Sequence, residues 1–330
     1  MADAEPALLP PIRGLRTYWE RRLAHRSSPP GDWIADKLLL DALGLGLEQV
    51  LEFLAAEAPG FEGFCRWIVA TAGLPDALTI ARYHAALDSA PPPPETAAHL
   101  AMIDAMPDAL DAGDIAHWGA QGYVILRSAI TPEEVAAAAT LLWQTVGADP
   151  ADPSSWYGPR TNGLMVQRFQ HAALEPVRRS TRVHKAFAQL WGTSDLWVHI
   201  DRMSFNAPVH AHHAFAAPRL HWDVSLVQPI PFGTQAILYL ADTDADQGAL
   251  ELVPGFHHGL AEWLETQGDA DPRRVDLSDR AVHVPGRAGD LIIWRQDLPH
   301  GASPNTAALP RLAQYVNFYA AKMAMQPVWR

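Results

Sequence analysis

The sequence contains little cysteine, few basic residues and no long apolar run. Its one cysteine, Cys65, excludes an intrachain disulfide framework and is usual for a reducing compartment. The formal net charge is -12 and no cluster of Lys or Arg stands out, so we expect no nucleic-acid partner. No stretch approaches the roughly 18 uninterrupted apolar residues of a membrane span. The start, MADAEPALLPPIRG, lacks the pattern of a signal peptide. These absences predict a cytoplasmic protein with no membrane partner.

The first ninety residues have the apolar spacing of amphipathic helices. Residues 37–58 and 61–74 repeat Leu, Ile, Phe and Trp every three or four positions, and Pro75 and Asp76 provide a start signal for a further helix. Four prolines at 91–94 cannot continue a helix. We therefore expect a helical N-terminal extension over 1–95 and a second domain over 96–330. That domain is expected to begin with one helix over about 95–120.

From Gly122 onward the pattern changes to that of strands. GYVIL at 122–126 is a short apolar run, and Thr131 followed by Pro-Glu-Glu has the residues that begin a helix. The later strand candidates are bounded by Gly, Pro, Asn or Asp and read LWVHIDRMSF, HWDVSLV, QAILYLAD, ALELVPG, AVHVPG, DLIIW and RLAQYVNFYA. Few helices separate them. This predicts a mainly β domain, an antiparallel sandwich or barrel with flanking helices.

One of these segments carries two ligand-capable side chains two residues apart. In a strand, His221 and Asp223 would project from one face and Trp222 from the other. An imidazole nitrogen and a carboxylate oxygen can then bind one cation, with a third ligand from elsewhere in the chain. The pattern alone is not specific, because residues 199–201 read His-Ile-Asp.

Three later stretches distinguish the two pairs. GALELVPG at 248–255 is a predicted strand that enters a Pro-Gly turn. GDLIIW at 289–294 is another, and LPHG at 298–301 then places His300 in a loop, before Arg311 opens the final strand. In this order, and together with HWGAQGYVILRSAITPEEVAAA at 117–138, the motifs resemble the phytanoyl-CoA dioxygenase family of iron(II)- and 2-oxoglutarate-dependent oxygenases. The resemblance covers roughly residues 110–322.

The resemblance implies a double-stranded β-helix, a cupin-like jelly roll whose mouth holds the metal. It implies iron(II) ligands at His221, Asp223 and His300, and an Arg311 that binds the distal carboxylate of 2-oxoglutarate. Two imidazoles and one carboxylate leave positions open for the 2-oxo acid and dioxygen, and the planar fork of arginine suits a carboxylate. Polar residues where the family often contacts its cosubstrate or substrate are expected to do so here: Gln167, Arg168, Asn206 and Ser303.

The implied activity is hydroxylation of an aliphatic C–H bond of a small organic molecule, with release of succinate and carbon dioxide. Two alternatives stay open: a non-catalytic jelly roll that binds a metal or a metabolite, and a cupin-type metalloenzyme that does not use 2-oxoglutarate. The substrate is not indicated, and no basic cluster is present for the phosphates of coenzyme A. The N-terminal helices are expected to cap the active site, to form a homodimer or to bind a carrier partner.

Overall fold

Helices form the N-terminal part of the chain, as the apolar spacing predicts. The computed structural model describes residues 9–27, 29, 32–158, 164–215, 220–326 and 328–329. The helices before the proline run are α1 (Leu15–Leu23), α2 (Trp33–Ala42), α3 (Leu47–Glu57), α4 (Phe61–Ala72) and α5 (Ala77–Leu87). Residues 37–58 divide between α2 and α3, because the chain turns at Gly44, whose φ of 71° suits glycine.

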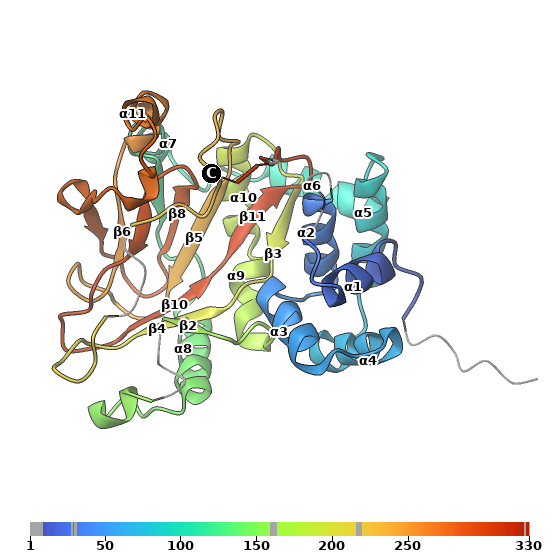
Figure 1. Ribbon diagram of the computed structural model, residues 1–330, viewed down its shortest axis with the longest axis horizontal. Coiled ribbons are helices and arrows are strands. Elements are labelled where there is room, and N and C mark those ends of the chain that lie inside the picture. Colours follow the sequence, from blue (N-terminus) through green and yellow to red (C-terminus); the bar gives the residue numbers. More distant parts are fainter. Residues whose placement is uncertain are drawn as a thin grey trace, which may run out of the picture.

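Helices α1 to α5 share one apolar core, called here the N-terminal core. Two residues of distant strands, Trp197 and Tyr319, are buried in this same core. They lie on β3 (Leu196–His199) and β11 (Asn317–Ala320), which pair with each other as a two-stranded ribbon. Figure 1 shows this β3–β11 ribbon between the N-terminal helices and the remaining strands. The ribbon therefore joins the helical part of the chain to the β part.

Two helices connect the N-terminal core to the first strand, α6 (Pro94–Ala105) and α7 (Ala112–Gln121). The prediction of one helix over 95–120 is therefore wrong. Pro107 explains the break, since the residue before a proline avoids the helical conformation. The chain becomes helical again at Asp111, whose carboxylate accepts a hydrogen bond from the backbone of Asp114. Across the described residues, every helix is too short or too polar to cross a membrane.

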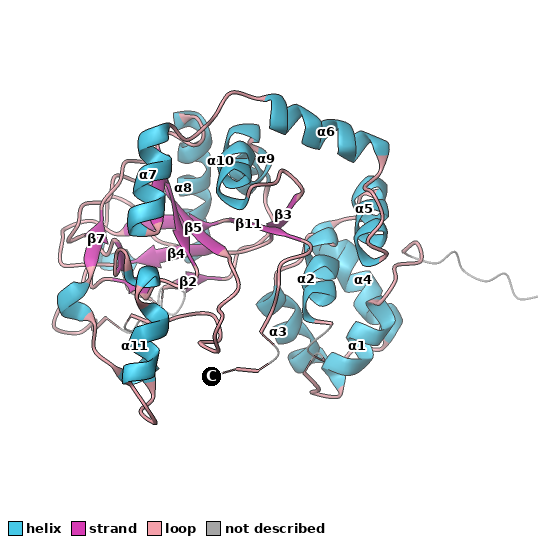
Figure 2. Cartoon of the chain, turned by 90° about the horizontal axis from the view of Figure 1, so that it is seen from above, coloured by secondary structure: helices cyan, strands magenta, loops and turns pink. Residues whose placement is uncertain are grey.

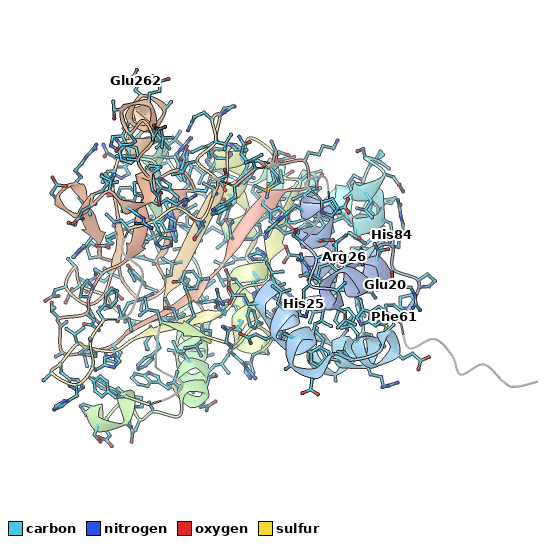
Figure 3. All side chains as sticks on the ribbon, viewed as in Figure 1. Glu20, His25, Arg26, Phe61, His84 and Glu262 are labelled. Carbon is cyan, nitrogen blue, oxygen red and sulfur yellow. The ribbon has the colours of Figure 1, made fainter. Side chains whose placement is uncertain are left out.

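Four further helices lie among or beside the strands. They are α8 (Pro132–Val146), α9 (Glu175–Arg179), α10 (Thr181–Trp191) and α11 (Leu260–Thr266). The predicted start of α8 is confirmed, because the Thr131 hydroxyl accepts a hydrogen bond from the backbone N–H of Glu134. Helix α11 lies far from the N-terminal helices, as the positions of Glu262 and Glu20 in Figure 3 make plain.

The strands pair in antiparallel fashion into three sheets. The large sheet has the order β1-β8-β5-β10-β4-β2, the small sheet has the order β7-β6-β9, and the third is the β3–β11 ribbon. The bounds of the strands in the first two sheets are β1 (Tyr123–Leu126), β2 (Met165–Val166), β4 (Met203–Asn206), β5 (Thr234–Tyr239), β6 (Leu250–Leu252), β7 (Val282–Val284), β8 (Leu291–Arg295), β9 (His300–Ala302) and β10 (Arg311–Tyr315). A mixed α and antiparallel β fold results.

Central strand β5 is apolar on both faces because both faces are covered. Ile237 and Tyr239 pack in the core between the large and small sheets, whereas Leu238 packs in the core that α8 and α10 share with the large sheet. The Tyr239 hydroxyl joins the two sheets, since it donates to the carbonyl of Val284 and accepts from the N–H of Leu250, each at 2.9 Å. Figure 2 shows α8 and α10 along one side of the strands.

Three of the predicted strands differ from the structure. HWDVSLV forms no strand beyond a single bridge at His221. The segment predicted as one final strand is divided into β10 and β11 at Val316, and LWVHIDRMSF is divided into β3 and β4. Both divisions have one cause: the ribbon turns away from the large sheet to reach the N-terminal core. The N–H of Tyr315 still donates to the carbonyl of Arg202 where the strands separate, at 3.0 Å.

Asp41 at the end of α2 makes the junction between helices and ribbon. Its buried carboxylate accepts hydrogen bonds from the hydroxyl of Tyr319 at 2.6 Å and the backbone N–H of Ile200 at 2.9 Å, and it lies 3.0 Å from Nδ1 of His199. Burial alone would raise its pKa, but the charges of His199 and Lys37 and these hydrogen bonds lower it. This stabilisation is therefore present above the usual Asp pKa and is lost as the pH falls through the folded-state value.

We predict that Asp41→Ala destabilises the protein by about 3 kcal/mol, because it leaves several buried polar groups unpaired. The measurement is the midpoint of thermal or urea unfolding. Asp88→Ala is the control, since it removes an ion pair with Arg13 whose side chains are 51% and 56% exposed, and a solvent-exposed pair contributes little to stability. Equal effects of the two substitutions would contradict the assigned role of Asp41.

Candidate active site

The HWD segment is a loop with one point of sheet pairing. His221 and His300 exchange two backbone hydrogen bonds of 2.9 and 3.0 Å, which form an isolated antiparallel bridge. His300 begins β9 and does not lie in the predicted loop. Trp222 points into the core between the sheets, as predicted, and its indole donates to the carbonyl of Asp297 at 3.0 Å. The bridge therefore preserves the alternation of side chains although no regular strand forms.

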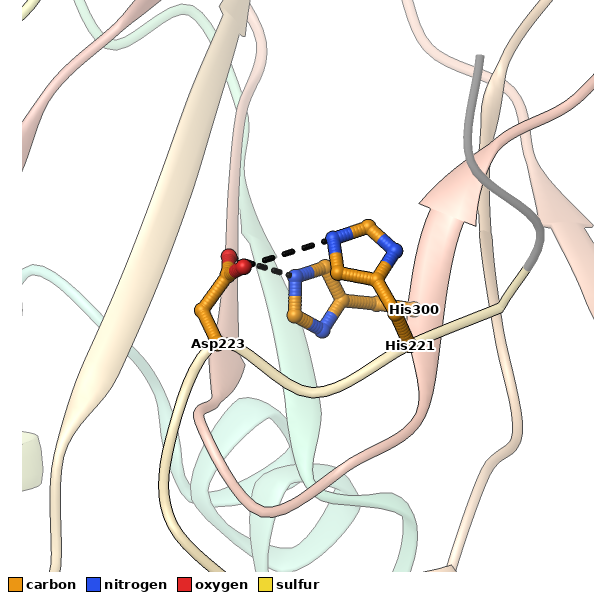
Figure 4. A group of neighbouring side chains, drawn as sticks. All are labelled: His221, Asp223 and His300. Atoms are coloured by element: carbon orange, nitrogen blue, oxygen red, sulfur yellow. Dashed lines mark hydrogen bonds and ion pairs between the residues drawn. The ribbon is translucent and has the colours of Figure 1, made fainter. Parts of the chain in front are cut away.

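The bridge brings three potential ligands together. The imidazole rings of His221 and His300 have centroids 4.8 Å apart. The Asp223 carboxylate lies 3.4 Å from Nε2 of His221 and 3.3 Å from Nε2 of His300. Figure 4 shows the three side chains pointing toward one another. One ligand atom from each lies within 4.8 Å of the others, a spacing that fits one metal ion between two imidazoles and a carboxylate.

His300 is oriented for metal binding by its other ring nitrogen. Nδ1 lies 3.0 Å from the carbonyl oxygen of Leu298, which can only accept a hydrogen bond. In the neutral ring that binds a metal, the proton therefore sits on Nδ1, and Nε2, the nitrogen that faces Asp223 and His221, is the ligand atom. A backbone carbonyl that fixes the tautomer in this way is a common support for a metal-binding histidine.

Gln235 orients the Asp223 carboxylate, and the sequence did not point to it. Its side-chain amide donates to Asp223 at 2.7 Å and accepts from the indole of Trp294 at 3.2 Å. Alternation along β5 places Gln235 on the same face as Ile237, toward the small sheet. The one sequence feature that could have indicated this role is an amide side chain near the start of an otherwise apolar strand. Its pairing opposite Trp294 required the register of β5 and β8.

The surroundings of Asp223 keep its carboxylate ionised. Burial by itself would raise the pKa of this group, but without a metal the protonated imidazoles of His221 and His300 donate hydrogen bonds to it, and their charges add to this, so the pKa is lowered. An ionised carboxylate is the form that binds a cation. When a metal ion takes the place of the imidazole protons, the ionised Asp223 and the Nε2 atoms of the two neutral imidazoles form a set of three ligands.

The triad opens into a cavity of about 920 Å³. Arg311, at the start of β10, lines the same cavity and is 1% exposed. In the described part of the chain, no hydrogen-bond partner lies near its buried Nε and Nη2 atoms. A buried guanidinium without an acceptor is costly. Its donors therefore fit an anionic ligand, such as a carboxylate, that enters the cavity.

The other four predicted cosubstrate residues lie elsewhere. Asn206 pairs with Arg311 in the register of β4 and β10, but its amide donates to the carbonyl of Ser303 at 3.1 Å. The Ser303 hydroxyl donates to the carbonyl of Ala249 at 3.0 Å. Gln167 is exposed and Arg168 is half-buried, in the segment after β2. Of the residues that the structure describes, these four are not among those that line the cavity.

Comparison with known proteins identifies the family. The sequence profile of the phytanoyl-CoA dioxygenase family (PhyH) matches residues 118–313, which span β1 to β10 and include the triad and Arg311. The chain belongs to this family. It is therefore an iron- and 2-oxoglutarate-dependent dioxygenase, as the order of the sequence motifs predicted.

The similarity to individual relatives is lower. A putative phytanoyl-CoA dioxygenase of Dictyostelium discoideum is 20% identical over 252 residues, which cover 60% of this chain and 72% of the relative. An ectoine dioxygenase of Nocardia farcinica is 22% identical over 219 residues, 58% of this chain and 71% of the relative. Among solved structures, EvdO2 from Micromonospora carbonacea var. aurantiaca has a TM-score of 0.48 at 19% identity, covering 67% of this chain and 93% of that one.

The N-terminal helices of this dioxygenase line part of its cavity. Trp33, Lys37 and Leu40 of α2 share the cavity with the triad, and Met323 and Met325 near the C-terminus also line it. The family match begins only at residue 118, so it does not reach these helices. Their amphipathic spacing predicted a packed helical unit but could not indicate which residues would face the metal site.

We predict that Gln235→Leu weakens metal binding by about tenfold, because Asp223 loses the donor that orients it and such supports typically contribute 10–100-fold in affinity. The measurement is an anaerobic titration with iron(II), with circular dichroism to verify the fold. Gln296→Leu is the matched control: Gln296 also lines the cavity, but its amide donates to the carbonyl of Pro231. An unchanged affinity in Gln235→Leu would disprove the role of this residue.

Proposed function

We propose that this dioxygenase binds iron(II) through His221, Asp223 and His300 and binds the far carboxylate of 2-oxoglutarate through Arg311. The proposal rests mainly on the Arg311 guanidinium, which is buried in the triad cavity and has donors without an acceptor among the described residues. A planar fork of donors suits a carboxylate. A cupin-type enzyme without 2-oxoglutarate does not account for an arginine in this state, and formation of succinate distinguishes the proposed enzyme from a binding-only jelly roll.

The proposed reaction hydroxylates a C–H bond of a small organic molecule. Iron(II), when bound, supplies the activation of dioxygen that accompanies decarboxylation of 2-oxoglutarate. One oxygen atom of dioxygen enters succinate, the other becomes the hydroxyl group of the product, and carbon dioxide leaves. The chain's own residues orient the metal ligands, neutralise the cosubstrate through Arg311 and provide apolar walls that exclude water from the reacting groups.

We further propose that the large and small sheets form a double-stranded β-helix. Their antiparallel pairing and shared core support this architecture, as does the position of His300 at the start of β9. The division into an N-terminal extension (1–95) and a catalytic domain (96–330) stays a prediction. So do the cytoplasmic location, the homodimer or carrier partner, and the cosubstrate contacts of Asn206, Ser303, Gln167 and Arg168.

Arg311→Met is expected to raise the dissociation constant for 2-oxoglutarate by about 100-fold, because loss of one partner from a buried charge pair costs about 2–5 kcal/mol. Isothermal titration calorimetry with the iron-loaded protein under nitrogen measures this. Arg202→Met is the control, since Arg202 lines the same cavity but is already paired with Glu48. If Arg311→Met binds 2-oxoglutarate as tightly as wild type, the assignment of Arg311 is wrong.

His300→Ala is expected to lose bound iron and with it the formation of succinate, because two ligands hold a divalent metal far less tightly than three. Metal content after dialysis and succinate release measure the two effects. For metal content, His199→Ala is the control and is expected to keep its iron, because His199 belongs to the second H-x-D pattern and contacts Asp41. Retention of stoichiometric iron by His300→Ala would exclude the proposed triad.

A further inference from the structure

We propose that the substrate is an uncharged, largely apolar molecule, larger than 2-oxoglutarate, with an oxygen atom that is hydrogen-bonded by the pair Lys37 and His199. It would occupy the cavity between α2, the β3–β11 ribbon and the C-terminal segment. This inference rests on the proposed function, because the same cavity contains the triad and Arg311. Cavity size, wall chemistry and charge pairing support it independently of one another.

The size and walls of the cavity indicate a mainly apolar occupant. Its volume of about 920 Å³ lies near the upper end of the roughly 300–1,000 Å³ usual for ligand pockets, far more than 2-oxoglutarate requires. Several large apolar side chains line it: Trp33, Leu47, Trp191, Met323, Met325 and Trp329. Two of these large apolar side chains are left open to solvent, since Trp33 is 43% exposed and Trp329 is 67% exposed. A ligand would cover such surfaces at a gain in free energy.

Charge pairing argues against an ionic substrate. Apart from Arg311, three cationic residues line the cavity in the described part of the chain, and each already has an acidic partner. The pairs are Arg22 with Asp36 at 3.5 Å, Lys37 with Asp41 at 3.7 Å, and Arg202 with Glu48. The acidic residues that line the cavity outside the triad, Asp36, Glu48 and Asp201, are in turn paired with arginines. An ionic group of either sign would therefore be a buried charge without a free counter-charge, which is costly. A coenzyme A thioester, with its phosphates, would be excluded on this ground.

Lys37 and His199 supply the polar end of the cavity. The Lys37 Nζ atom lies 2.6 Å from Nδ1 of His199 and 4.3 Å from the ring centroid of Tyr319. An ammonium group has three donors, and its neighbours Asp41 and His199 occupy at most two of them, which leaves one for a ligand. Both side chains line the cavity and are partly exposed, 19% for Lys37 and 25% for His199. A hydrogen bond can therefore reach a carbonyl or hydroxyl oxygen without breaking the junction at Asp41.

Three probes with one apolar cage and different charges test this inference: adamantanemethanol, adamantanecarboxylate and adamantanemethylamine. Binding to the iron-loaded full chain with saturating 2-oxoglutarate is measured under nitrogen, by tryptophan fluorescence and by saturation-transfer NMR. The alcohol is expected to bind about tenfold more tightly than either ion, since each ion would be buried without a counter-charge. Tighter binding of the carboxylate or of the ammonium ion would overturn the proposal.

The variant Lys37→Met separates recognition from a structural role. It is expected to weaken binding of the alcohol by about tenfold and to improve binding of the ammonium ion, because Asp41 then lacks one of its two cationic neighbours. Arg82→Met is the matched control: Arg82 also joins the N-terminal helices to the ribbon, through Asp195 at 2.7 Å, but it does not line the cavity. If both variants change the order of the three probes alike, Lys37 has only a structural role and the proposal fails.

Binding of 2-oxoglutarate is measured in the same samples, and it distinguishes a failure of the substrate inference from a failure of the proposed function. If 2-oxoglutarate binds but the alcohol is not preferred, the inference about the substrate fails and the proposed function stands. If 2-oxoglutarate does not bind to the iron-loaded protein, the proposed function itself fails.

Discussion

Two backbone hydrogen bonds between His221 and His300 are the constraint on which the active site depends. The residues are far apart in sequence, and within the described part of the chain the HWD segment has no other strand pairing. This bridge aligns the two imidazoles, and the short spacing to Asp223 then closes the triad. Gln235 orients the carboxylate of Asp223, and the carbonyl of Leu298 orients the imidazole of His300. The metal site is therefore built mainly by backbone geometry, with side chains that adjust it.

A second physical rule accounts for the rest of the cavity: buried charges need partners. Asp41 and Arg202 have partners across the junction between the helices and the strands, and Arg22 pairs with Asp36 within the N-terminal helices. Arg311 differs from them, since among the described residues it has no acidic partner, and two of its buried nitrogens, Nε and Nη2, have no acceptor. One unsatisfied cation in an otherwise neutralised cavity thus separates the cosubstrate end from the region assigned to the substrate.

The sequence predicted several features because local chemistry fixes them. Thr131 begins α8 through its own hydroxyl, and the apolar spacing before residue 90 needs no distant partner to indicate helices. It erred where distant contacts decide. The final predicted strand is divided at Val316 because β11 leaves the large sheet to pair with β3, and its Tyr319 is buried among N-terminal helices that the pattern of that strand cannot reveal.

The sequence alone therefore determined the family, the metal-binding residues to test and the arginine for the cosubstrate, because these follow from residue types in a fixed order. Only the tertiary structure decided what surrounds them. Gln235 meets Asp223, and Lys37 meets His199, through pairings of elements that lie far apart along the chain. Each residue type can be identified from its own position in the sequence. The wall of a cavity, by contrast, is formed by distant segments that only the packing of the cores brings together.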